Sequence, residues 1–332
     1  MTTYLPRFHR NWTGFSEVFG ISADQVITSM NNADDDIPEQ EPKYKISLNS
    51  VGVTRNNIPV QILDPFGSGK VVQVDCSIVA ETAVPYFKRG IHMSRIGDIL
   101  AKMTQEVFVS LQEYSLNVAN LLTDLEYGGS SKVEVKGELS YLEQVEGWKP
   151  EKNKVSLEHI GLSATTYTKH EKDYIQNAGI EFSNITACPC VQSTYRHTLL
   201  QSNSELDKHL INPLITHSQR CRTKVEILNI HGQLNIPITA ILNQIDTGIV
   251  RVQNTLPREY ELLMVYQAHK YPQFIEDVVR EIALKVSQVT LENFPTSSLK
   301  VTSQSIESIH DFNIQALLED SIQNFSTASS LN

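Results

Sequence analysis

Residues 154–187 read KVSLEHIGLSATTYTKHEKDYIQNAGIEFSNITA, a stretch with two β-branched segments on either side of a short charged break. The segments 154–168 and 178–187 are rich in Val, Ile, Thr and Tyr, and parts of them alternate between apolar and polar residues. This composition and this period of two are typical of β-strands with one buried face. The sequence therefore predicts two strands in the middle of the chain.

The same alternation continues toward the N-terminus. It predicts strands at 132–142, at 71–79 and within 44–62, with a hairpin turn at Gly67 to Gly69. Between these strands, apolar residues recur at helical spacing and predict one long helix, capped by Ser94 and continuing to about residue 122.

Toward the C-terminus, the pattern predicts helices and strands at 192–210 (helix), 222–230 (strand), 237–246 (helix), 272–290 (helix) and 298–308 (strand). Strands precede helices twice along the chain, and there is no regular βαβ alternation. The predicted class is therefore α+β, with an antiparallel sheet.

The two ends of the chain are polar. Residues 1–42 contain the acidic run 34–36 and predict a solvated arm, whereas residues 315–332 are rich in Ser, Asn and Gln and predict a frayed tail. We expect residues 43–314 to form one domain. A chain of 332 residues with 40% hydrophobic content is long enough to bury a core.

The net charge of -10 argues against general nucleic-acid binding, since such proteins usually carry an excess of Lys and Arg. No stretch approaches the roughly 18 apolar residues of a membrane span, and the N-terminus has no apolar signal core. Four cysteines are too few for a disulfide scaffold of this length. We therefore predict a cytoplasmic protein with neither nucleic acid nor membrane as a partner.

The strongest chemical signal is ACPC at 187–190, after an apolar strand, with THSQR at 216–220 downstream. A thiolate and an imidazole are ligands that suit Zn or Fe(II). Cys-x-Cys is not the Cys-x-x-Cys of common zinc and redox motifs, so buried structural thiols are the alternative.

A second signal is KRGIHMSR at 88–95, where a loop enters the predicted long helix. Basic side chains and a hydroxyl beside a helix N-terminus can bind phosphate. A capping sequence on a solvated face is the alternative.

Six motifs follow one another between about residues 44 and 312: SLNSVGV (47–53), RGIHMSR (89–95), ACPC (187–190), THSQR (216–220), PQFIEDVVR (272–280) and ESIH (307–310). Together they resemble the type IB GTP cyclohydrolase family of bacteria and archaea. The resemblance implies the tunnelling fold, with an antiparallel sheet backed by helices and two related halves in one chain. It also implies a homotetramer with active sites between subunits.

The activity that the resemblance implies is hydrolysis of GTP, or a related guanine nucleotide, at C8 of the guanine ring, with a dihydroneopterin-type product. It implies Cys188 and His217 as ligands of one divalent metal per chain, Zn, Fe(II) or Mn. His310 would carry protons, with Cys190 in support. The substrate-binding residues implied are His92, Ser94, Arg95, Arg220 and Glu259.

The chain departs from the family's pattern at three places. Ile249 stands where the family has a metal-binding Glu, and Phe312 stands where it has a second active-site histidine. The Glu that would anchor the guanine edge falls at Met264 or Tyr266.

Glu259 or Glu261 remains a candidate for one of these two carboxylate roles, although both also fit an exposed helix surface. The departures indicate a diverged member with a partial product, C8-hydrated or ring-opened. The alternative is a non-catalytic paralogue that binds a purine or pterin or serves as a structural subunit.

Overall fold

The computed structural model describes residues 37–125, 129–145, 153–169, 173–202 and 215–329, together with residues 20–22, 24–25, 28 and 151. The chain divides into two compact units. The larger contains residues 49–83 and everything described from Met93 onward, and the smaller contains the described residues up to Leu48 together with Val84–His92.

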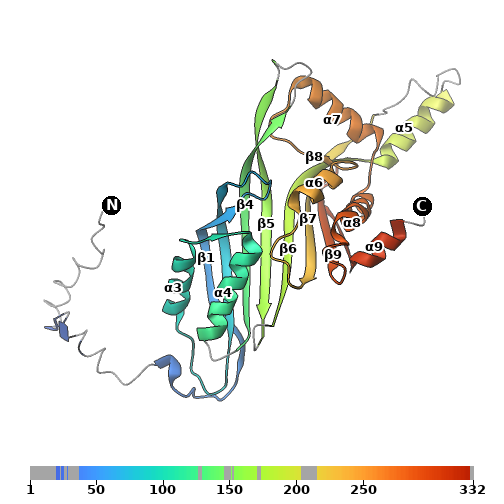
Figure 1. The fold of residues 1–332 in the computed structure, drawn as a ribbon. Helices are drawn as coiled ribbons and strands as arrows, with labels where there is room; N and C mark the ends of the chain where they lie inside the picture. Colours follow the sequence, from blue (N-terminus) through green and yellow to red (C-terminus); the bar gives the residue numbers. More distant parts are fainter. Residues whose placement is uncertain are drawn as a thin grey trace. The chain divides into compact units, whose positions relative to one another are not determined.

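The larger unit is built on one extended sheet (Figure 1), with the strand order β10-β9-β7-β6-β5-β4-β2-β1-β3. From β2 to β10 the neighbouring strands on this path are antiparallel, β1 and β3 are parallel, and β8 pairs with β6. The strands are β1 (Leu48–Leu63), β2 (Val71–Val84), β3 (Val107–Phe108), β4 (Ser131–Val145), β5 (Lys154–Thr168), β6 (Tyr174–Ala187), β7 (Ser218–Ile230), β8 (Val250–Arg251), β9 (Ser298–Ile306) and β10 (Ile314–Ser321).

The order of elements repeats. Two strands, β1 and β2, precede α3 and α4, and two strands, β4 and β5, follow; then β6 and β7 precede the helices α6 to α8, and β9 and β10 follow. The helices are η1 (Ile37–Glu39), α3 (Met93–Met103), α4 (Leu111–Leu125), α5 (Pro189–Ser202), α6 (Ile238–Ile245), α7 (Arg258–Lys270), α8 (Ile275–Thr290) and α9 (Ile322–Ser329). The α+β prediction, with two related halves, is confirmed.

One face of the sheet carries the core. In β4, Val133 and Val135 are fully buried and face α4, which contacts β4 and β5, whereas Lys132 and Glu134 point to the opposite face. In the second half α8 packs on β9 in the same way. Each large apolar side chain buried on this face contributes about 1.5–3 kcal/mol before the entropy cost of ordering it.

The single long helix predicted from Ser94 is wrong, because α3 ends at Met103 and α4 begins only at Leu111. Ser110 Oγ accepts hydrogen bonds from the backbone N–H of Gln112 (3.1 Å) and of Glu113 (3.3 Å), and the Glu113 carboxylate accepts one from Val109 N (2.5 Å). Ser110 is therefore the N-cap of α4, and a hydroxyl cap of this kind starts a new helix. Apolar residues keep a helical spacing across the gap between α3 and α4, so the sequence pattern does not reveal the break.

The prediction of a frayed tail is also wrong for residues 315–329. There β10 pairs with β9 over its whole length, and α9 buries Ile322 and Phe325. Of the predicted helix 192–210, α5 covers the part up to Ser202, and residues 203–210 lie outside the described residues. Among the described residues, the helices are too short or too polar to cross a membrane.

Candidate active site

The two central motifs meet where β6 ends and β7 begins. Ala187 pairs with Ser218 in the last register of these strands, so the flanking residues lie side by side. Cys188 N donates to His217 O (3.0 Å), and Thr216 Oγ1 donates to Cys188 O (2.7 Å). Cys188 is half-buried, and Cys190, in the first turn of α5, is exposed.

The ESIH motif reaches the same end of the sheet. β9 ends at Ile306, which pairs with Arg220 near the start of β7. Ser308 Oγ lies 3.2 Å from His217 Nδ1, and the rings of His217 and His310 meet edge to face with centroids 6.4 Å apart. The structure therefore brings Cys188, His217 and His310 together from three separate parts of the chain.

Phe312 lies against this cluster. Its ring stacks on the ring of His310, with centroids 5.0 Å apart and an angle of 8° between the planes. Both side chains are exposed. An apolar ring therefore covers one face of His310 where the family's pattern predicts a second imidazole.

The other two cysteines are not available as ligands. Cys76 and Cys221 are fully buried. Burial, with a smaller contribution from Asp75, raises the pKa of the Cys76 thiol to about 12, and burial also raises the pKa of Cys221. Both remain protonated at neutral pH, and metals bind the thiolate form.

Cys188 and His217 fit two positions of a Zn or Fe(II) site, since a thiolate and an imidazole are borderline-soft donors. Within the part of the chain that the structure describes, no third His, Cys, Asp or Glu joins them closely enough to complete a metal-binding group. A catalytic zinc usually has three protein ligands and an open position. The described residues of one copy therefore supply an incomplete ligand set.

Ile249 lies near this cluster. It follows α6 and precedes β8, whose Val250 pairs with Ile185 close to the end of β6. Its side chain is buried and lines a pocket of about 320 Å³ that also includes Tyr260 and Met264 from α7. An apolar side chain thus occupies the position where the resemblance implies a carboxylate ligand. Glu259 lies at the start of α7 and is half-buried, whereas Glu261 is exposed.

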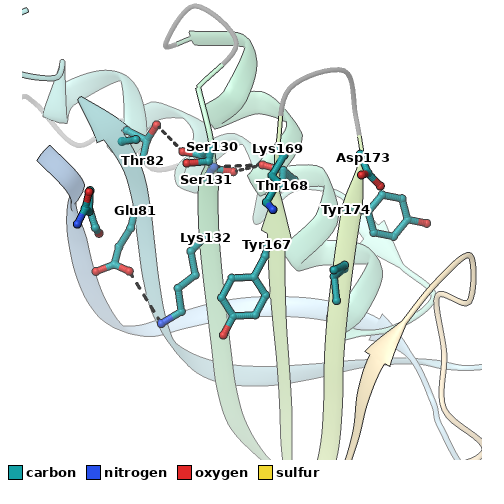
Figure 2. A pocket seen from close by; sticks show the side chains of 14 residues that line it. Glu81, Thr82, Ser130, Ser131, Lys132, Tyr167, Thr168, Lys169, Asp173 and Tyr174 are labelled. Carbon is teal, nitrogen blue, oxygen red and sulfur yellow. Dashed lines mark hydrogen bonds and ion pairs between the residues drawn. The ribbon is translucent and has the colours of Figure 1, made fainter. Parts of the chain in front are cut away.

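A second polar site lies at the other end of the sheet (Figure 2). A pocket of about 340 Å³ follows the row of paired residues Thr82, Ser131, Thr168 and Tyr174. Its other lining residues include Asn49 and Ser50 from the SLNSVGV motif, and Glu81, Lys132 and Tyr167. Lys132 Nζ lies 4.0 Å from Glu81 Oε2 and 5.9 Å from the Tyr167 ring centroid.

The predicted substrate-binding residues divide between these two regions. Ser94 and Arg95, both exposed, lie in the first turn of α3, which begins after β2 toward the pocket end of the sheet (Figure 1). Arg220, near the start of β7, is exposed at the end that carries Cys188. His92 belongs to the smaller unit, where its Nε2 lies 3.2 Å from Glu39 Oε1.

The directions of the strands keep these regions apart. β2, β4, β5 and β6 alternate in direction, so β6 begins where β2 ends. β6 has 14 residues, and a strand rises about 3.3 Å per residue, so Cys188 lies roughly 40 Å along the sheet from the pocket end. The two ends of β6 are therefore too far apart for one small molecule to contact both within one copy.

Known proteins resemble this chain over most of its length. The family model described as "Type I GTP cyclohydrolase folE2" matches residues 35–316. GTP cyclohydrolase MptA of Thermoplasma volcanium is 28% identical over 287 residues, which cover 86% of this chain and 94% of that protein. GTP cyclohydrolase MptA of Methanocaldococcus jannaschii is 28% identical over 304 residues, covering 83% and 91%.

Solved structures of uricases also align with the chain. The uricase of Bacillus fastidious aligns with a TM-score of 0.47 and 9% identity, covering 84% of this chain and 96% of that one. The uricase of Arthrobacter globiformis aligns with a TM-score of 0.44 and 8% identity, covering 82% and 93%.

Proposed function

Because the chain belongs to the type I GTP cyclohydrolase family described as folE2, we propose that it is a metal-dependent hydrolase that attacks C8 of the guanine ring of GTP. Membership of this family makes the chain an enzyme. The observation that carries the proposal for the site is the cluster of Cys188, His217 and His310, which the fold assembles at one end of the sheet. The family match at residues 35–316 supports a catalytic domain at about 43–314.

More narrowly, the enzyme is of type IB, as the order of the six motifs indicates, and it acts in the cytoplasm. The four cysteines are free thiols, as expected in a reducing compartment. The family is metal-dependent, and the donor set of Cys188 and His217 favours Zn, Fe(II) or Mn, with one ion per chain.

The chain's own side chains divide the chemistry between them. Cys188 and His217 hold the metal, which when bound supplies Lewis acidity and favours the ionisation of water near neutral pH. His310 stands beside His217 and is exposed to the site. An imidazole can accept and donate protons near neutral pH, so His310 delivers a proton to the ring nitrogen that departs from C8.

Substrate binding needs a second copy of the chain. Ser94 and Arg95 suit a triphosphate, because a guanidinium forms charge-assisted bonds to phosphate oxygens and a helix N-terminus favours anions. The helix α3 that carries them begins toward the pocket end of the sheet, which lies roughly 40 Å from Cys188 along β6. A homotetramer that sets this end of one copy against the Cys188 end of another completes the site. It also covers sheet edges that would otherwise be exposed.

A second candidate function differs from the first in its product. Ile249 removes an anionic ligand and Phe312 removes a proton carrier, while Cys188, His217 and His310 are present. Attack at C8 needs the metal and its ligands, whereas release of formate needs further proton transfers. Each general acid–base group contributes about 10²–10⁴-fold to such a step. A C8-hydrated or ring-opened product, with slow release of formate, is therefore the second candidate.

The test is to incubate anaerobically purified protein with GTP and Zn, Fe(II) or Mn, and to measure formate and the nucleotide product by mass spectrometry. Formate in proportion to a dihydroneopterin-type product indicates the complete reaction. A product that is heavier than GTP by one water, without formate, indicates the partial one, and Phe312→His should then increase formate release. No conversion of GTP with any of the metals would contradict the proposed function.

A further inference from the structure

The segment that connects β9 to β10, residues 307–313, carries His310 and holds it beside His217. This segment belongs to no helix or strand. Ser308 Oγ lies 3.2 Å from His217 Nδ1, which ties the segment to the residue before β7. His310 and Phe312 follow, and their rings stack on one another. The segment therefore makes defined contacts, although most of its side chains are exposed.

Two aromatic contacts set the orientation of the His310 ring. The ring lies parallel to that of Phe312, with 8° between the planes and 5.0 Å between the centroids, and perpendicular to that of His217, with 88° and 6.4 Å. Among the described residues, no hydrogen bond to a ring nitrogen of His310 adds to these contacts. Parallel stacking restricts the imidazole to one plane, because rotation about its Cβ–Cγ bond would tilt it away from Phe312.

Stacking suits a histidine that has to transfer a proton. The stack uses the face of the imidazole, whereas both ring nitrogens lie at its edge, so stacking does not block their hydrogen bonds. An aromatic pair contributes more than the apolar area that it buries, and this contribution corresponds to about a two- to tenfold preference for the stacked arrangement. Without such a contact, an exposed side chain changes rotamer within nanoseconds.

We propose that Phe312 is a positioning residue, whose ring holds the imidazole of His310 in the orientation in which it exchanges a proton with the substrate. This rests on the proposed function, which makes His310 the proton carrier. Phe312 cannot transfer a proton, so its role differs from that of the histidine that the family pattern has at this position. It acts through the plane of the His310 ring alone.

The first measurement needs no catalysis. In full-length protein with labelled histidine, the signals of the His310 ring protons are identified by their loss in His310→Gln. In the wild type the ring current of Phe312 should shift these signals upfield, and in Phe312→Leu they should move to the positions of a freely exposed histidine. Phe312→Tyr keeps a six-membered ring and should keep the shift.

Ile309→Ala is the matched control for this measurement. Ile309 is 59% exposed, close to the 58% of Phe312, and it lies in the same segment but carries no aromatic ring. The His310 signals should therefore stay shifted in Ile309→Ala. Identical His310 signals in the wild type and in Phe312→Leu would overturn the proposal.

The second measurement separates positioning from substrate contact. Phe312→Leu should lower kcat for GTP conversion by about two- to tenfold, the preference that the stack supplies, and should leave the Kd for GTP and the metal content unchanged. Phe312→Tyr should recover most of the kcat, because the stacked ring is restored. Calorimetry with GTP and elemental analysis of both variants complete the comparison.

A weaker affinity for GTP at unchanged kcat would show that Phe312 contacts the substrate, and would overturn the proposal. So would a loss of kcat in Phe312→Leu that Phe312→Tyr fails to recover. If the wild-type protein binds GTP but never converts it, the proposed function fails, and the histidine signals alone decide this inference.

Discussion

The two ends of the sheet present different kinds of side chain, although the two halves of the chain repeat the same order of strands and helices. At the end where β6 and β7 join, the side chains are a thiol and imidazoles, from Cys188, His217 and His310. At the pocket end, where β2 finishes and β6 begins, the lining side chains include hydroxyls, carboxylates and the amines of Lys132 and Lys169. The two ends therefore differ in the kinds of polar side chain that they present.

The two halves also differ in the connections between their paired strands. The β1–β2 connection, residues 64–70, is a short turn in which Gly67 and Gly69 adopt positive φ, as the predicted hairpin requires. The corresponding β6–β7 connection carries Cys188, α5 and His217. Connections at a sheet end tolerate insertion because few core contacts depend on them. The two halves therefore differ at this connection, while helices cover an apolar face of the sheet in both.

The largest expected effect is at the Cys188 end. The Cys188→Ala/His217→Ala variant should fall from about one metal ion per chain to almost none, and should lose GTP conversion, because both soft donors are removed. Elemental analysis of the purified protein measures this. His159→Ala, at a surface site on β5, is the control and should keep its metal. Full metal content in a folded double variant would reject both ligands.

The next largest effect is expected if one site combines the two ends of the sheet from different copies of the chain. At GTP concentrations well below the KM of the Arg95→Ala variant, Cys188→Ala and Arg95→Ala should each be nearly inactive. Their co-expressed mixture should recover about a quarter of the wild-type activity, because random assembly leaves that share of intersubunit sites intact. Light scattering should show an oligomer. A stable, active monomer, or a co-assembled mixture without recovery, would contradict a site shared between copies.

A smaller effect is expected from Arg95 alone. Arg95→Ala should weaken GTP binding by about 10–100-fold, since a charge-assisted bond to phosphate contributes roughly 1.5–3 kcal/mol, and should leave guanosine binding almost unchanged. Calorimetry with both ligands distinguishes the two. Arg222→Ala serves as control, because Arg222 is exposed and pairs with Glu181 at 3.3 Å on the sheet. Equal losses for both ligands would mean that Arg95 does not contact the triphosphate.

The smallest effect is expected between the two ends, at the start of α4. Ser110→Ala should lower the free energy of unfolding by about 1–2 kcal/mol through loss of the cap, and lower the Tm by a few degrees. Metal content and GTP affinity should not change. Thermal unfolding with metal analysis tests this, and a loss of metal would show that the ends are not independent of the core between them.

Much of the fold was accessible from local patterns. β5 has the predicted bounds of 154–168, because its alternation is unbroken. α7 was missed because its apolar side chains, such as Leu262 and Val265, are exposed and form no buried helical stripe. The candidate cluster was found through short motifs. The contact between Glu39 and His92 was not predicted, because a single carboxylate in a polar segment has no local signature.

The sequence by itself determined which segments alternate between apolar and polar residues and which have apolar residues at helical spacing, since these patterns depend on near neighbours in the chain. It also determined which side chains are able to bind a metal or transfer a proton. Only the tertiary structure decided where those side chains lie. Cys188, His217 and His310 meet because β6, β7 and β9 pair in one register. Arg95 lies far from them because β2 and β6 run in opposite directions. Register and direction are set by long-range strand pairing and burial, which no local pattern contains.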